Sequence, residues 1–185
     1  LNGNGYYDLG GAYILGECYD ILTTTNLYIS DYDYKGSLPS EIGNLINLET
    51  LTINGYGFGC YESDDTINQW WTTWCILHCN DTDECDGGIP QEIWNLTNLK
   101  NLEITNTNLR GEIPAEIGNL NLLESLNLYD NQLTGSIPAA IGNLNSLEYL
   151  NLGYNQLNGS IPAAIGNLNS LEGLDLWDNQ LTGSI

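Results

Sequence analysis

The chain has 185 residues, and 24 acidic side chains against 3 basic ones give it a net charge of −21 at pH 7. Such a charge repels phosphate backbones and anionic lipid surfaces, so we expect no nucleic acid among the partners. No apolar run approaches the roughly 18 residues that a membrane-spanning helix needs, so we expect no membrane insertion in this segment.

The first 26 residues precede the regular part of the sequence, and we interpret residues 1–26 as a diverged N-terminal coil or cap. Ile14 and Ile21 fall in phase with the core positions of the repeat that begins at Leu27. This phase predicts a coil that packs on the next one, because a single repeat unit cannot bury its apolar side chains alone.

Residues 27–185 follow a strict period of 24 residues. Equivalent leucines mark the period: Leu27, Leu51, Leu102, Leu126, Leu150 and Leu174. Most units continue with a Gly-x-Ile/Leu-Pro step and then with IGNL or a near-copy. One interval measures 51 residues, which is one period plus an insertion of 27, and the regular phase returns directly afterwards. A fixed period of this length predicts a stacked repeat architecture.

Within the unit LESLNLYDNQLTGSIP, from Leu123 to Pro138, the alternating leucines predict a short strand with its leucines turned inward. The asparagine after the strand favours a tight bend, because its amide can bond neighbouring backbone groups. Gly135 permits a close backbone approach, and Pro138 prevents the sheet from continuing. Stacked units would bury their leucines continuously, with neighbouring strands about 4.8 Å apart.

The motif LxxLxLxxNxLxGxIPxxIGNL, which covers roughly residues 21–185, resembles the plant-type leucine-rich repeat of receptor ectodomains and secreted inhibitors. The resemblance implies an α/β repeat solenoid. This would be a right-handed leucine-rich-repeat coil with a parallel β-sheet on the concave face and mostly irregular or 3-10 segments on the convex face. It also implies a module that binds proteins, peptides or glycans, without a cofactor.

The insertion, residues 60–86, is rich in cysteine and tryptophan. A disulfide between Cys60 and Cys85 would close it, which is worth about 3 kcal/mol in the chain-entropy model. Cys75 and Cys79 could then pair inside the loop, although four cysteines allow three pairings and the sequence does not choose among them. Cys18 is left over, either free or bonded to a partner chain.

The insertion also has metal and ligand interpretations. Cys75, His78, Cys79 and Cys85 are zinc-ligand types, but their spacing fits no zinc module. The acidic run at residues 81–86 lacks the glycine and the distal glutamate of a helix-loop-helix calcium site. We therefore assign no metal. The three tryptophans at residues 70, 71 and 74 are better explained as the insertion's own small core than as a ligand platform.

Three Asn-x-Ser/Thr sequons begin at Asn80, Asn95 and Asn158. They predict N-glycosylation and therefore an extracellular or cell-surface protein. Asn95 occupies the asparagine position of the IGNL segment, where a structural role is the alternative.

The residues do not predict catalysis. The carboxylates Glu49, Glu124, Glu148 and Glu172 hold one repeat position, which is typical of a solvated edge that arose by duplication. The single histidine lies in the cysteine-rich loop, so a Ser-His-acid triad is not supported. We expect no catalytic residues and no enzyme activity.

Outward strand positions and the bends after them form the predicted binding face. It combines aromatic and acidic side chains: Tyr28, Asp31, Glu103, Tyr129, Asp130, Tyr149, Tyr154, Trp177 and Asp178. Such a mixture suits a protein or glycan ligand, and we expect its four C-terminal aromatic residues to cluster. The alternative is that the rings only cover the sheet as cross-strand pairs.

An alternative function is a structural subunit that assembles end to end with other copies into a filament or cell-surface layer. The sequence breaks off inside a unit, and an uncapped end would expose Leu174, Leu176, Leu181 and Ile185. Continuation of the natural chain beyond this segment explains the same feature. Ice binding is less favoured, because no regular Thr-x-Thr array recurs in the sequence.

Overall fold

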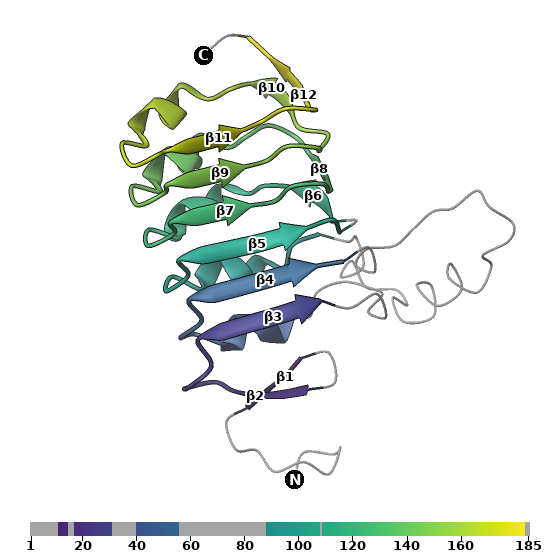
Figure 1. Ribbon diagram of the computed structural model, residues 1–185, viewed down its shortest axis with the longest axis vertical. Coiled ribbons are helices and arrows are strands. Elements are labelled where there is room, and N and C mark those ends of the chain that lie inside the picture. The colour runs from purple at the N-terminus through teal and green to yellow at the C-terminus, as the bar shows by residue number, and fades with distance from the viewer. Residues whose placement is uncertain (1–10, 15–16, 31–39, 56–87, 108, 184–185) are drawn as a thin grey trace, which may run out of the picture.

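The computed structural model describes residues 11–14, 17–30, 40–55, 88–107 and 109–183. From residue 26 onward these residues form successive coils of a solenoid, stacked along its long axis (Figure 1). Every helix in the described ranges is a short 3-10 helix. The predicted solenoid, with a parallel sheet on one side and 3-10 segments on the other, is confirmed.

The main sheet is parallel, has six strands, and runs in the order β3-β4-β5-β7-β9-β11. The strands are β3 (Asn26–Ser30), β4 (Thr50–Asn54), β5 (Asn101–Thr105), β7 (Ser125–Asn127), β9 (Tyr149–Asn151) and β11 (Gly173–Asp175). The repeat leucines lie opposite one another, and Leu51 pairs with Leu102 across the 51-residue interval. The insertion therefore leaves the register of the sheet intact.

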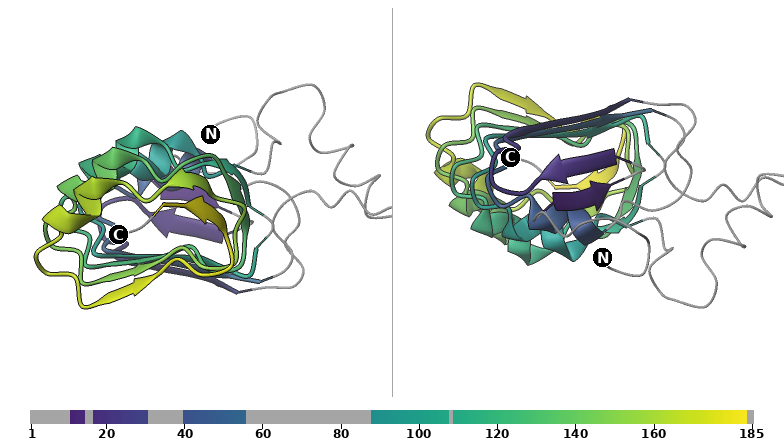
Figure 2. Two further views of the ribbon diagram at one scale, coloured as in Figure 1. Left: turned by 90° about the horizontal axis from the view of Figure 1, so that it is seen from above. Right: turned by 90° about the horizontal axis from the view of Figure 1, so that it is seen from below.

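A column of 3-10 helices lies across the solenoid from the main sheet (Figure 2). It consists of η1 (Ser40–Asn44), η3 (Gln91–Asn95), η4 (Ala115–Asn119), η5 (Ala139–Asn143) and η6 (Ala163–Asn167). Proline precedes the last four of these helices, where its fixed φ suits a helix start and its missing N–H costs nothing. Each of these prolines accepts a hydrogen bond at its carbonyl from the isoleucine three residues later.

Short parallel pairings on a flank of the solenoid were not anticipated from the sequence. Strand β6 (Arg110–Glu112) pairs with β8 (Gln132–Thr134), and β10 (Asn158–Ser160) pairs with β12 (Gln180–Thr182). A single bridge between Ser136 and Asn158 links the two pairs. A glycine with positive φ, from 73° to 89°, lies at the centre of β6 and of β10 and directly after β8 and β12, so these segments lack the regular alternation by which a strand is recognised in a sequence.

At the N-terminal end, β1 (Gly11–Ile14) and β2 (Glu17–Asp20) form an antiparallel hairpin beside the first coil (Figure 1). Ile21 follows it, half-buried and packed against the core. The assignment of residues 1–26 as a separate cap stays a prediction.

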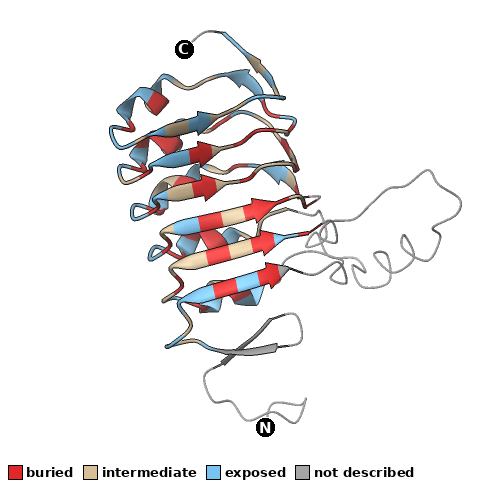
Figure 3. Ribbon diagram, in the orientation of Figure 1, coloured by how far each residue is buried: buried red, intermediate tan, exposed pale blue. Residues whose placement is uncertain are grey.

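The core is a continuous column of leucine and isoleucine side chains (Figure 3). The repeat leucines from Leu51 to Leu150 are at most 1% exposed, whereas Leu174 in the last described coil is 37% exposed. Each coil thus buries the side chains of its neighbour rather than its own alone. Among the residues that the structure describes, no helix is long and apolar enough to cross a membrane.

A ladder of asparagine side chains lies at the bend that follows each C-terminal strand. Asn155 donates through Nδ2 to the carbonyls of Leu128, Leu152 and Gly153, at 2.9 to 3.1 Å, and its Oδ1 accepts from the Leu133 N–H at 3.0 Å. Asn131 and Asn179 repeat this pattern one coil away on either side. The expected asparagine bend is therefore confirmed, and it also joins adjacent coils.

Asn155→Ala should lower the free energy of unfolding by about 2–3 kcal/mol, because it leaves several buried backbone groups without a partner. The matched control is Asn145→Ala, whose amide donates to the Asn143 carbonyl within one exposed turn and should cost less than about 0.5 kcal/mol. Urea denaturation measures both. Equal losses in the two variants would contradict a structural role for the ladder.

Candidate functional site

The C-terminal ends of β7, β9 and β11 close with the same side-chain contact. Asn127, Asn151 and Asp175 point outward between two inward leucines. Each accepts a hydrogen bond at Oδ1 from the backbone N–H two residues later, at 3.0 to 3.2 Å. These side chains fix the bend that aims the following residues.

The residue next in the bend has a left-handed backbone in four consecutive coils. Asn106, Asp130, Tyr154 and Asp178 have φ between 52° and 54°. Asparagine and aspartate tolerate this conformation, whereas an aromatic residue does so at a cost of about 1–2 kcal/mol. Tyr154 is therefore the exception in the row, and residues held in such strain concentrate at functional sites.

Three rings from three coils form one continuous surface, which we call the aromatic ridge: Tyr129, Tyr154 and Trp177. The centroids of Tyr129 and Tyr154 lie 5.2 Å apart, and those of Tyr154 and Trp177 lie 4.3 Å apart. Both pairs are edge-to-face, with interplanar angles of 72° and 77°. Trp177 remains 54% exposed, so the ridge presents apolar surface to solvent.

Tyr149 does not belong to this ridge, and the expected cluster of four aromatic residues is wrong in this respect. It begins β9, at the opposite end of the strand from the bend, and its hydroxyl donates to Glu172 Oε2 at 3.1 Å. This hydrogen bond, together with the negative charge of Glu172, raises the pKa of Tyr149. Tyr149 and Tyr154 are only five residues apart, and this short spacing does not reveal that they lie at opposite ends of β9.

The ring of Tyr149 lies over Gly173 of the next coil, where a β-carbon would come within 2.9 Å of Tyr149 Cδ1. Beside it, the outward surface of β7, β9 and β11 forms a hollow of about 410 Å³. The hollow is lined by both residues and by Ser125, Asn127, Asn151 and Asp175, among others. Gly173 is not among the site residues that the sequence predicts, although alignment of the repeat places it in line with Ser125 and Tyr149.

The other predicted face residues are dispersed. Tyr28 is exposed on β3, at the far end of the sheet order from β11, and Glu103 lies on β5 between them. Asp130 and Asp178 directly follow ridge residues in the bends. Asp31 lies outside the described residues. The site that the structure brings together therefore consists of the aromatic ridge with Asp130 and Asp178.

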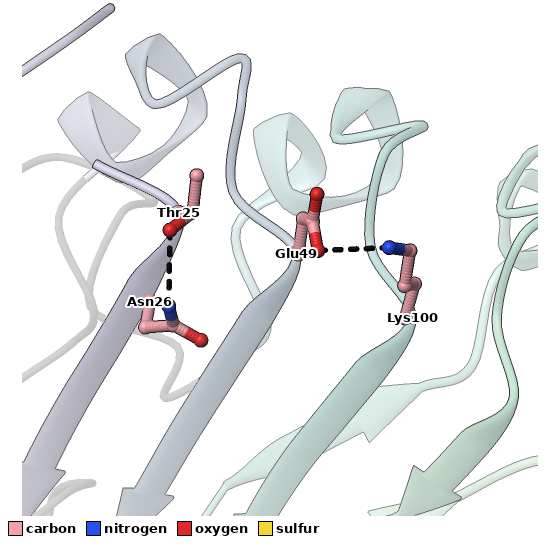
Figure 4. A network of polar contacts seen from close by, with 4 residues as sticks. All are labelled: Thr25, Asn26, Glu49 and Lys100. Carbon is pink, nitrogen blue, oxygen red and sulfur yellow. Dashed lines mark hydrogen bonds and ion pairs between the residues drawn. The ribbon is translucent and has the colours of Figure 1, made fainter. Parts of the chain in front are cut away.

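Lys100 and Arg110, the basic residues within the described ranges, are engaged away from the ridge. Lys100 Nζ lies 2.8 Å from Glu49 Oε2 at the start of the strands, near Thr25 and Asn26 (Figure 4). This hydrogen bond and the charge of Glu49 raise the pKa of Lys100. On the flank, Arg110 Nε donates to Gln132 Oε1 at 3.0 Å. The charged side chains of the ridge itself are acidic.

The modification and assembly residues are placed in part. Asn95, at the end of η3, and Asn158, on β10, are both exposed. Leu176 and Leu181 are half-buried at the end that exposes Leu174. Four cysteines, one sequon asparagine and one terminal residue fall outside the described part: Cys60, Cys75, Cys79, Cys85, Asn80 and Ile185. Among described residues, no group of three or more His, Cys, Asp or Glu could hold a metal.

Comparison with solved structures finds similar coils in plant receptors. The plant peptide hormone receptor RGFR1, solved in complex with RGF2, is 30% identical with a TM-score of 0.68 over 87% of this chain and 22% of that one. The ectodomain of GASSHO1/SCHENGEN3 from Arabidopsis thaliana, in complex with CASPARIAN STRIP INTEGRITY FACTOR 2, is 35% identical with a TM-score of 0.67 over 85% of this chain and 16% of that one.

A plant ice-binding protein is also similar, at 30% identity and a TM-score of 0.64, over 84% of this chain and 42% of that one. The chain thus spans less than half the length of each of these three neighbours. The search among curated proteins finds no match. A family model described as a leucine-rich repeat region matches residues 71–184. With its 24-residue coils, parallel sheet and asparagine ladder, the chain belongs to the leucine-rich repeat family.

Proposed function

We propose that the chain is a non-catalytic extracellular recognition module, which binds a polypeptide or glycan at the aromatic ridge. The single observation that carries this proposal is the ridge itself. Its three rings are held edge-to-face across three coils, and its central residue, Tyr154, keeps an unfavourable backbone conformation. Large rigid rings of this kind supply much of the contact energy in protein interfaces.

The alternative, that the rings only cover the sheet, explains less. Tyr154 stands where three other coils use asparagine or aspartate at no comparable backbone cost. Its two edge-to-face contacts, worth about 0.5–1.5 kcal/mol each, about offset this cost, so the tyrosine adds little stability to the fold. Trp177 also stays more than half exposed after packing. A bound ligand would bury the surface that remains.

Similarity to a plant peptide hormone receptor solved with RGF2 and to a receptor kinase ectodomain solved with CASPARIAN STRIP INTEGRITY FACTOR 2 supports recognition as the class of function. The exposed sequon residues Asn95 and Asn158 support an extracellular location. Asn95 ends a 3-10 helix and Asn158 lies on the flank, so N-glycans at either position would leave the ridge open.

Tyr154→Asn and Trp177→Ala should each weaken binding more than about tenfold for the ligands that the unmodified protein selects from a displayed peptide library or a glycan array. Tyr154→Asn should change the free energy of unfolding by less than about 1 kcal/mol, because lost ring contacts and relieved strain offset each other.

The control for these two variants is Leu122→Ala, which removes an exposed apolar side chain from the turn between η4 and β7 and should leave binding unchanged. Affinity and urea denaturation are measured on the same preparations. Full retention of every selected ligand by both ridge variants would refute the proposal.

Ice binding remains the least favoured function, although one structural neighbour is a plant ice-binding protein. The flank exposes Ser136, Asn158, Ser160 and Thr182, but Arg110 and Glu112 interrupt the row at β6. The Thr182 hydroxyl also donates to the Gly159 carbonyl rather than standing free.

A further inference from the structure

The equivalent left-handed bend residues of successive coils form a row, which we call the bend row. In this row Asp130 and Asp178 lie on either side of Tyr154. Backbone hydrogen bonds align the row: the Asp130 N–H donates to the Gly153 carbonyl at 3.1 Å, and the Tyr154 N–H donates to the Trp177 carbonyl at 3.0 Å. Tyr154 therefore lies between Asp130 and Asp178, with neighbouring coils about 5 Å apart. A carboxylate therefore lies next to Tyr154 in the coil before it and in the coil after it.

Resting on the proposed function, we propose that the ligand of the aromatic ridge is a basic polypeptide segment. An arginine or lysine of this segment would lie against the rings of Tyr154 and Trp177 and pair with Asp178, and a second basic residue would pair with Asp130, two coils or about 10 Å away. Cations are attracted to the faces of aromatic rings, and arginine in particular stacks on them. Trp177 packs against Tyr154 and is still 54% exposed, so part of its ring surface is open to this contact.

The charges of the chain favour this ligand over acidic ones. The net charge is −21, and the described basic residues are engaged with Glu49 and Gln132 rather than with the ridge. An acidic peptide, an acidic glycan or a phosphate group would meet repulsion on approach. A neutral glycan could accept contact with the rings but would gain nothing from the two charges beside them.

The backbones of Asp130 and Asp178 suit the left-handed bend, and their carboxylates lie at its surface, where a ligand can reach them. The aspartate that fixes the last bend is Asp175, which accepts the Trp177 N–H, whereas Asp178 is exposed beyond it. Asp130 is half-exposed at the equivalent bend position, two coils before Asp178. Asp130 and Asp178 flank Tyr154 across three coils, so they suit a peptide that carries two basic side chains.

The probe for the test is a fluorescein-labelled peptide that alternates glycine and arginine, compared with the same peptide carrying citrulline, which is neutral and of the same shape. Fluorescence anisotropy with the intact chain measures the affinity. The arginine peptide should bind about tenfold or more tightly than the citrulline peptide, and added salt should reduce the difference.

The double variant Asp130→Asn/Asp178→Asn should weaken arginine-peptide binding about tenfold. Its matched control, Glu41→Gln/Glu116→Gln, removes two exposed charges from the 3-10 helices and should weaken binding less than about twofold. The two double variants change the net charge equally. Equal losses in both, or equal affinity for the two peptides, would overturn the proposal and leave only general charge attraction.

A failure of this inference is distinguishable from a failure of the proposed function. If Trp177→Ala abolishes binding of a selected neutral glycan or acidic peptide while the aspartate variant does not, the ridge is a binding site but its ligand is not basic. If Trp177→Ala leaves every ligand bound, the recognition function itself is refuted.

Discussion

The in-register stacking of 24-residue coils is the constraint on which the rest of the structure depends. No coil buries its own leucines, so each requires its neighbour at one fixed offset. The asparagine ladder sets this offset: each side chain donates to carbonyls of its own bend and of the preceding coil, and Asn155 and Asn179 also accept a backbone N–H. A shift by one residue would place apolar side chains on the outer face and leave buried carbonyls unpaired.

The same ladder makes the aromatic ridge rigid. Because every bend has one geometry, the rings of Tyr129 and Trp177 occupy one bend position and the ring of Tyr154, in the coil between them, occupies the next, close enough for edge-to-face contact with both. A site that is ordered before binding loses less conformational entropy when a ligand arrives. The strain at Tyr154 is supported by the bonds of Asn155, the next residue, which hold the bend in place. Stability and recognition therefore depend on the same few positions.

Much of the fold was predictable, because a leucine period and an asparagine bend have direct physical meanings. The flank strands were missed because a glycine with positive φ lies within or directly after each of them and their side chains do not alternate. The aromatic cluster was predicted only in part. Tyr149 and Tyr154 are close in sequence but lie at opposite ends of β9. The hydroxyl of Tyr149 contacts Glu172, whereas the ring of Tyr154, in the bend, contacts Trp177.

Local exceptions to the repeat also limited the prediction. Trp94 is 1% exposed at a position where other coils carry glycine, such as Gly118. At Gly118 a β-carbon would meet the Ala140 carbonyl oxygen of the next coil at 2.9 Å. A large side chain at this position is compatible only with a different spacing between neighbouring helices, which a consensus motif does not encode. Departures from the consensus, here Trp94, Tyr154 and Gly173, carry the information that is specific to this chain.

The central claim is that a basic peptide lies on the aromatic ridge, and chemical-shift mapping tests it most directly. The glycine-arginine peptide is titrated into the isotopically labelled protein, with the Trp177 indole signal assigned through Trp177→Phe. The account predicts saturable shifts of the Trp177 indole and of the backbone amides of Tyr154 and Asp178, with little change along η4, η5 and η6. Shifts confined to the 3-10 helices, or none at saturating peptide, would contradict it.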